Sequence, residues 1–190
     1  MSVPKNVLIL KSSPRLRSNS SALADRLADG ARQTGAHVDA FNLHRMDIRP
    51  CDACEACRNS AAGECIVGDD MQTLYPLLRR ADAIVIASPV YWFNLSAQAK
   101  LCIDRWYALE GPEGSAMRGK HFALLITYGD DDPISSGGVN AMRTFRDICC
   151  YLHADVDGII YGTASDEGDI EQHPDLLEKA YKLGQKMAGS

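Results

Sequence analysis

Five short apolar runs, separated by stretches with helical periodicity, organise this chain of 190 residues. Each run has the length of a buried strand, and the strongest of them is DAIVIAS at residues 82–88. The five predicted strands are residues 6–11, 37–43, 82–88, 121–127 and 156–161. Strands that alternate with helices are typical of a parallel sheet, because a parallel pair needs a long crossover connection.

The intervening segments carry apolar residues at helical spacing and predict five helices. The predicted helices are residues 20–34, 69–80, 96–109, 138–152 and 174–187. A chain of this length and order suits a single α/β domain, residues 1–190, with helices on both faces. Its sheet is predicted to be doubly wound, five-stranded and parallel, in the order 2-1-3-4-5. Ligands of such sheets bind at the carboxyl ends of the first and third strands.

Charge and hydropathy exclude several classes of protein. The formal net charge of −5 argues against broad binding of nucleic acid or anionic membrane surfaces, because both require a basic face. No apolar run approaches the ~20 residues of a membrane span, and the first residues lack the features of a signal peptide. We therefore expect a cytoplasmic protein without a membrane or nucleic-acid partner. Its seven cysteines are not expected to form a disulfide framework.

A polar loop joins the first predicted strand to the first predicted helix. It reads SSPRLRSNS, which places hydroxyl and amide side chains and two arginines at a helix N-terminus. Free N–H groups and the positive end of the helix dipole make such a terminus suitable for an anion. The candidate phosphate-binding residues are Ser12, Ser13, Pro14, Arg15, Ser18, Asn19 and Ser20. The alternative is an ordinary capped loop, in which serine and asparagine are common.

Two further loops leave the same edge of the predicted sheet. The loop after the third strand holds three consecutive aromatic residues, which suit a flat heterocycle, and the loop after the fourth is polar and rich in glycine. The candidate ring-binding residues are Pro89, Val90, Tyr91, Trp92, Phe93, Tyr128 and Gly129. A hydrophobic lid, a subunit contact and a solvated connection are the alternatives. A phosphate site, an aromatic surface and a polar flap together match flavin mononucleotide (FMN).

Four cysteines interrupt the alternation of strands and helices, in an insertion at about residues 48–68. The four residues are Cys51, Cys54, Cys57 and Cys65. Their spacing, C-x2-C-x2-C-x7-C, favours a [4Fe–4S] cluster. The alternatives are a zinc site, which usually pairs two separated C-x2-C units, and a set of free thiols. The cysteines expected to be buried in helices are Cys102, Cys149 and Cys150.

Arg105 and Trp106 lie on the predicted helix that follows the aromatic loop. One interpretation places both residues at a subunit interface. The other interpretation pairs Arg105 with Asp104 or Glu110 and packs Trp106 in the core. The sequence alone leaves both interpretations open.

Several of these segments together resemble the NAD(P)H-dependent FMN reductases. The shared segments are residues 12–15, 18–20, 69–71, 81–92, 96–98 and 100–105. This resemblance covers most of the chain and is most specific between residues 81 and 106. It implies a flavodoxin-like fold, bound FMN and a homodimer or homotetramer. One branch, the iron–sulfur flavoproteins, carries a compact four-cysteine motif at the place of the insertion, whereas the family usually has glycine in place of Ser12.

The resemblance and the three loops predict an FMN-dependent oxidoreductase. It would move electrons from NAD(P)H through bound FMN to a small acceptor, namely a quinone, a flavin, a nitroaromatic, a metal ion or oxygen. The flavin carries the chemistry, so no catalytic side chain is expected. The alternative is an electron carrier between ferredoxin-like donors and an acceptor, through FMN and a [4Fe–4S] cluster. A third hypothesis is a non-enzymatic redox-sensing or binding module, because fold alone does not decide function.

Overall fold

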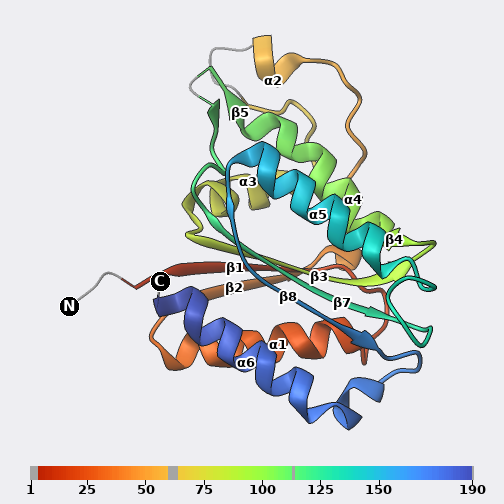
Figure 1. The fold of residues 1–190 in the computed structure, drawn as a ribbon. Helices are drawn as coiled ribbons and strands as arrows, with labels where there is room; N and C mark the ends of the chain where they lie inside the picture. Colours follow the sequence, from red (N-terminus) through yellow and green to blue (C-terminus); the bar gives the residue numbers. More distant parts are fainter. Residues whose placement is uncertain (1–3, 60–63, 113, 190) are drawn as a thin grey trace.

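The computed structural model describes residues 4–59, 64–112 and 114–189, and its centre is a parallel sheet (Figure 1). The strands lie in the order β2-β1-β3-β7-β8, and each of the four neighbouring pairs is parallel. Their bounds are Asn6–Lys11 for β1, His37–Asn42 for β2, Ala83–Tyr91 for β3, His121–Tyr128 for β7 and Asp155–Thr163 for β8. This order confirms the predicted doubly wound sheet of order 2-1-3-4-5.

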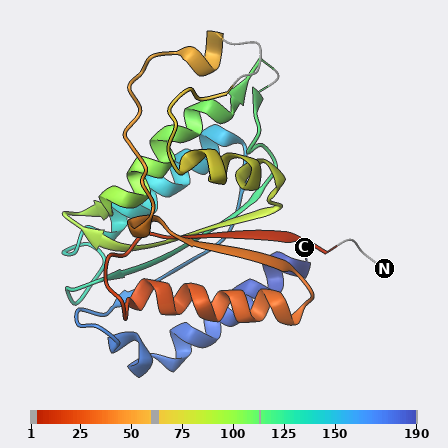
Figure 2. The same ribbon diagram turned by 180° about the vertical axis from the view of Figure 1, so that it is seen from behind.

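Helices cover both faces of the sheet, as Figures 1 and 2 show from opposite sides. One face carries α1 and α6, and the other carries α3, α4 and α5. The α-helices are α1 (Asn19–Gln33), α2 (Ala56–Asn59), α3 (Met71–Arg80), α4 (Ala97–Asp104), α5 (Gly138–Leu152) and α6 (Pro174–Gly189). The shorter elements are η1 (Leu43–Arg45), β4 (Asn94–Leu95), η2 (Arg105–Leu109), β5 (Glu110–Gly111), β6 (Gly114–Ser115) and η3 (Asp169–Gln172).

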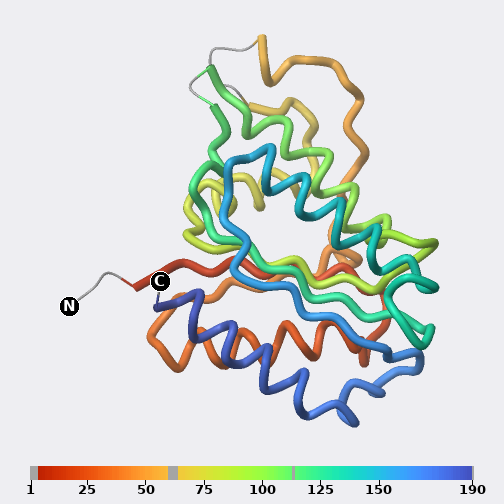
Figure 3. Tube along the Cα trace, in the orientation of Figure 1, coloured from red at the N-terminus to blue at the C-terminus, as the bar shows by residue number. Residues whose placement is uncertain are grey.

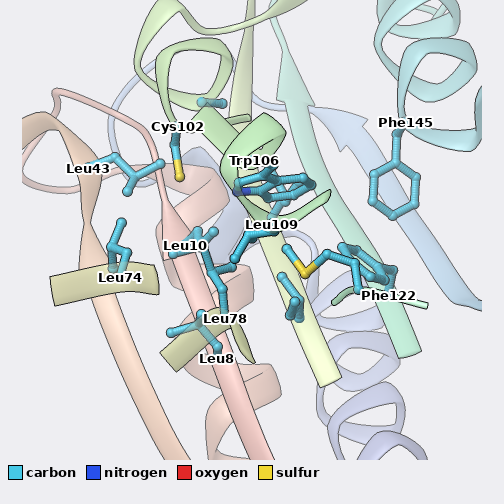
Figure 4. Close-up of a cluster of buried hydrophobic side chains, with 14 of the residues drawn as sticks. Leu8, Leu10, Leu43, Leu74, Leu78, Cys102, Trp106, Leu109, Phe122 and Phe145 are labelled. Carbon is cyan, nitrogen blue, oxygen red and sulfur yellow. The ribbon is translucent and has the colours of Figure 1, made fainter. Parts of the chain in front are cut away.

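Alternation of side chains along the strands divides the core into two clusters. In β1, Leu8 and Leu10 face the layer of α3, α4 and α5, whereas Val7 and Ile9 face α1 and α6. Figure 4 shows the first cluster, in which the ring of Phe122 meets that of Trp106 edge-on at a centroid distance of 6.0 Å. Trp106 is therefore a core residue, in agreement with one of the two interpretations drawn from the sequence.

Close packing of α1 against α6 depends on glycine. A Cβ on Gly184 would lie 2.0 Å from the carbonyl oxygen of Leu27, and a Cβ on Gly30 would lie 2.0 Å from that of Tyr181. Both distances are far below van der Waals contact, so any side chain at either position would push the helices apart. These two residues let the backbones of α1 and α6 touch beneath the sheet.

Two details of the helices differ from the predictions. The predicted helix at residues 96–109 ends as α4 at Asp104 and continues as the 3₁₀ helix η2. Cys102 and Cys149 are buried as predicted, but the prediction for Cys150 is wrong, because this residue is exposed. Adjacent positions of a helix differ by about 100° in direction, so only Cys149 of the pair faces the sheet.

In the part of the chain that the structure describes, no helix combines the length and the apolar character needed to cross a bilayer.

Candidate functional site

A cavity of about 200 Å³ opens at the carboxyl ends of the central strands. Its lining residues are Ser13, Arg15, Ser18, Asn19, Pro89, Val90, Tyr91, Thr127, Tyr128, Gly129, Ala164 and Ser165. They come from four segments: the loop after β1 with the first residue of α1, the end of β3, the end of β7 with the residue after it, and the segment after β8. The cavity therefore lies at the predicted switch point between the first and third strands of the sheet.

The cavity brings together part of the predicted set of site residues. The predicted residues that line it are Ser13, Arg15, Ser18, Asn19, Pro89, Val90, Tyr91, Tyr128 and Gly129. The predicted residues outside the lining are Ser12, Pro14, Ser20, Trp92 and Phe93. Thr127, Ala164 and Ser165 line the cavity but were missed by the sequence reasoning. Only their positions in the sequence could have indicated them. Thr127 is the last residue of the predicted fourth strand, and the other two follow the last strand, whose carboxyl end lies at the same edge of the sheet.

Ser12 is fully buried and ties the end of β1 to its neighbours. Its hydroxyl donates to the carbonyl oxygen of Ala87 at 3.1 Å, and it accepts from the hydroxyl of Ser96 at 2.9 Å. Ser96 is also the N-cap of α4, where its side chain accepts from the backbone N–H of Ala99. Ser12 thus joins β1, β3 and the start of α4 at the floor of the site.

The N-terminus of α1 forms the polar end of the cavity. Ser18 caps the helix by accepting from the backbone N–H of Ser21 at 3.3 Å. The side-chain N–H₂ of Asn19 donates to the carbonyl of Ala164 at 3.1 Å, while its oxygen accepts from the backbone N–H of Gly168 at 3.0 Å. Asn19 therefore holds the segment after β8 against the helix N-terminus, which is how Ala164 comes to line the cavity.

Arg15 is the sole cationic side chain among the described residues that line the cavity. It is exposed, and its guanidinium donates to the carbonyl oxygen of Ser165. Arg17, two residues further on, instead pairs with Glu171 at 3.3 Å on the outer surface. An exposed arginine beside buried hydroxyls and a helix N-terminus is an arrangement that suits a phosphate group.

The predicted aromatic loop is a β-hairpin, and the expectation of a loop there is wrong. Strand β3 continues through Tyr91 and pairs antiparallel with β4, with Val90 opposite Leu95. The turn consists of Trp92 and Phe93, with φ of 46° and 64°, a left-handed conformation that costs about 1–2 kcal/mol for each residue. The Trp92 side chain at the tip is 94% exposed.

Glycine allows the hairpin to pack against the start of α5. Gly137 has φ of 75°, and a Cβ there would lie 2.4 Å from the Cα of Phe93. The backbone of the hairpin turn consequently rests directly on Gly137. This contact fixes the hairpin at the edge of the cavity, with Tyr91 in the lining and Trp92 in solvent.

Tyr128, at the end of β7, forms another part of the cavity wall. Its side chain is buried, and burial together with the negative charges of Tyr161 and Asp132 raises the pKa of its hydroxyl. The hydroxyl is therefore protonated at neutral pH and remains a hydrogen-bond donor. The backbone N–H of Ala164 donates to the carbonyl of Tyr128 at 2.8 Å, which joins the ends of β7 and β8.

The cysteine insertion is closed at its base by two carboxylates. Asp70 accepts from the backbone N–H of Asp47 at 2.7 Å, and Asp69 accepts from that of Arg49 at 3.0 Å. Cys51 and Cys54 are exposed, whereas Cys57 and Cys65 are partly buried. Residues 60–63 of the insertion lie outside the described part of the chain. Within the described part, no group of three or more Cys, His, Asp or Glu side chains is placed to hold a metal ion.

The thiols nevertheless lie within electrostatic reach of one another. Burial and the charges of the other three thiolates raise the pKa of Cys57. Burial also acts against the thiolate of Cys65, but hydrogen bonds from the Val67 backbone, Tyr75 and Arg105 outweigh it and lower the pKa of that thiol. The surroundings of Cys65 therefore stabilise its thiolate, whereas those of Cys57 disfavour the thiolate of that residue.

The insertion and the cavity occupy different ends of the layer formed by α3, α4 and α5. Figures 1 and 3 show the chain leaving the end of β2, rising past α4 and reaching α2, away from the hairpin that carries β4. Here the guanidinium of Arg58 donates to the carbonyl of Glu110 at 3.1 Å, and the hydroxyl of Tyr107 donates to Glu55 at 3.4 Å. Both bonds attach the cysteine insertion to η2 and β5.

Known proteins match this chain in both sequence and fold. The family model for NADPH-dependent FMN reductase matches residues 5–163. An iron–sulfur flavoprotein of Archaeoglobus fulgidus is 31% identical over 93% of this chain and 76% of its own length. An iron–sulfur flavoprotein of Methanosarcina thermophila is 31% identical over 87% of this chain and 81% of its own. The structure of the NAD(P)H:quinone oxidoreductase from Methanothermobacter marburgensis has a TM-score of 0.70 at 20% identity, over 97% of this chain and 98% of that one.

The matched span contains all five strands of the parallel sheet and three of the four segments that line the cavity. The flavodoxin-like fold that the resemblance implied is therefore confirmed. The family match identifies the protein as an oxidoreductase, so the hypothesis of a non-enzymatic module is wrong. From its cavity, its sheet order and these matches together, the chain belongs to the NADPH-dependent FMN reductase family.

Proposed function

We propose that the protein binds FMN in the cavity at the switch point and transfers electrons from NAD(P)H to a small acceptor such as a quinone. One observation carries this proposal: a helix N-terminus, an aromatic hairpin and a glycine-containing loop converge on one cavity at the carboxyl ends of the strands. FMN, when bound, would supply hydride acceptance from the nicotinamide and electron release to the acceptor.

The residues of the cavity would divide the work of binding. Arg15, Ser13 and Ser18 would hold the phosphate, since they combine one exposed positive charge with two buried hydroxyls beside the N-terminus of α1. Pro89–Tyr91 and Tyr128 would bound the ring on two sides and exclude water from it. The protonated hydroxyl of Tyr128 would offer a hydrogen bond to a ring carbonyl or to the acceptor.

The reductase activity can be tested with the protein purified without oxygen. Its absorption spectrum should contain flavin bands, and mixing with NADH or NADPH in a stopped-flow instrument should bleach them. Subsequent addition of a quinone should restore the bands, and comparison of the two donors would identify the preferred nicotinamide. Flavin bands that neither nicotinamide bleaches would contradict the proposed reductase and favour an electron carrier.

We further propose that the four cysteines of the insertion hold a [4Fe–4S] cluster. Support comes from the spacing of the thiols, from the softness of a four-sulfur donor set and from two relatives that are named iron–sulfur flavoproteins. The donor set fits such a cluster chemically, because four thiolates are the ligands that a [4Fe–4S] cluster requires. Exposure of Cys51 and Cys54 would place the cluster near the surface, where a ferredoxin-like partner could exchange single electrons with it.

Analysis of iron, acid-labile sulfide and zinc in the anaerobic protein tests this second proposal. About four irons and four sulfides per chain are expected, and the variant Cys54→Ser should lose most of them. Cys150→Ser is the matched control, because Cys150 is an exposed cysteine outside the insertion. Iron at background levels in the wild-type protein would contradict the cluster, and stoichiometric zinc would identify a structural zinc site instead.

A further inference from the structure

Arg105 is buried in an ion pair at the base of the cysteine insertion. The side chain of Arg105 is 1% exposed, and that of its partner Asp69 is 0% exposed. The guanidinium donates to both carboxylate oxygens of Asp69, with nitrogen–oxygen distances of 2.5 and 3.2 Å. A bidentate pair of this kind fixes the plane of the guanidinium as well as its position.

The same guanidinium extends beyond its ion pair to a thiol. Its Nη1 also donates to the carbonyl oxygen of Arg49 at 2.9 Å, and its Nη2 donates to the Sγ of Cys65 at 3.3 Å. One planar group thus joins both ends of the insertion, the residues before Cys51 and the residues around Cys65. Among the described residues, no second arginine donates to a cysteine sulfur.

We propose that Arg105 is a positioning residue that holds Cys65 as the fixed ligand of the cluster and sets the reduction potential of that cluster. The inference rests on the [4Fe–4S] proposal above. Hydrogen bonds to the sulfur ligands stabilise the reduced, more negative cluster and raise its potential. Because Asp69 locks the guanidinium, the N–H that points at Cys65 stays in place in both redox states.

The variant Arg105→Lys separates the hydrogen bond from the charge. Lysine keeps the positive charge and can pair with Asp69, but its single ammonium group cannot reproduce the planar fork that reaches both the carboxylate and the sulfur. The paired variant Asp69→Asn/Arg105→Gln removes both charges together, so that no unpaired ion is left in the interior. Arg79→Lys is the matched control, because among the described residues the Arg79 side chain donates only to the carbonyl oxygen of Ala108, in the same region.

The decisive measurement is the reduction potential of the cluster, from a redox titration followed by electron paramagnetic resonance. In Arg105→Lys we expect the ratio of reduced to oxidised cluster at a given potential to fall about tenfold, which corresponds to a shift of about 59 mV for a one-electron couple. Iron loss to a chelator should accelerate in the same variant. The paired variant also lacks the guanidinium N–H that reaches Cys65, so both of its measurements should change in the same direction. Arg79→Lys should match the wild type.

Two results would overturn the inference in distinguishable ways. Wild-type protein without iron would remove the cluster proposal and this inference together. Iron in the wild type, with an unchanged potential and an unchanged rate of iron loss in Arg105→Lys and in the paired variant, would remove only the role of Arg105. FMN content and far-ultraviolet circular dichroism, measured on each variant, establish that the fold is intact.

Discussion

Replacement of Arg15 by alanine tests the phosphate end of the cavity most directly. Arg15 lines the cavity but is exposed, so its bond to a phosphate competes with water. A hydrogen bond to a charged group contributes about 1.5–3 kcal/mol, and solvent screening reduces this to about 1–2 kcal/mol at an exposed position. We therefore expect Arg15→Ala to raise the Kd for FMN by about 5- to 30-fold, measured by fluorescence titration of protein freed of flavin.

Two controls separate the phosphate contact from other effects of this change. Arg17→Ala removes an arginine from the same loop that pairs with Glu171 outside the cavity, so its Kd for FMN should stay within about twofold of the wild type. Riboflavin has the same ring but no phosphate, so Arg15→Ala should leave its affinity unchanged. Equal losses for FMN and riboflavin would mean that Arg15 acts through its bond to Ser165, and an unchanged Kd for FMN would refute the phosphate contact altogether.

Three further predictions concern stability and reactivity. Gly184→Ala should lower the free energy of unfolding in urea by about 1–3 kcal/mol through overpacking, whereas Gly189→Ala on the same helix meets no atom within 4 Å and should not destabilise. Iodoacetamide at pH 8 should alkylate the exposed Cys150 but not its neighbour Cys149, because burial raises the pKa of the Cys149 thiol to about 12. Peptide mass spectrometry measures both sites, and alkylation of both cysteines would contradict the prediction. Because the pKa of Tyr128 is raised, its hydroxyl keeps in the folded state a proton that the unfolded state loses near pH 10. The free energy of unfolding of the wild type should therefore decrease as pH rises through that range. In Tyr128→Phe this decrease should be smaller.

Local patterns in the sequence were sufficient to predict the sheet and the place of the cavity. The strand at residues 6–11 was predicted with the bounds of β1, because burial of both faces of the strand makes residues 7–10 continuously apolar between polar Asn6 and Lys11. The hairpin after β3 was missed because only two residue pairs hold it, Val90 with Leu95 and Tyr91 with Asn94. Its turn also uses Trp92 and Phe93, where hairpins usually have glycine or asparagine.

The sequence alone does not predict which residues from distant segments come into contact. Arg105 was expected to pair with Asp104 or Glu110, its neighbours along the chain, if it formed an ion pair at all. Its partner is Asp69, 36 residues earlier, which approaches only because α3 and η2 pack on the same face of the sheet. Ser165 enters the cavity for a similar reason, since the Asn19 side chain draws the segment after β8 to the start of α1.

Helix α4 connects the two candidate centres. Its N-cap, Ser96, hydrogen-bonds to Ser12 at the floor of the cavity, and the residue that follows its last turn, Arg105, hydrogen-bonds to Cys65. Eight helical residues rise about 12 Å, so one short rigid element separates the anchors of the two sites. The run at residues 81–106, where the resemblance to the FMN reductases is most specific, contains this whole connection. A displacement of α4 would therefore disturb both anchors, because Ser96 and Arg105 stand at opposite ends of the same short helix.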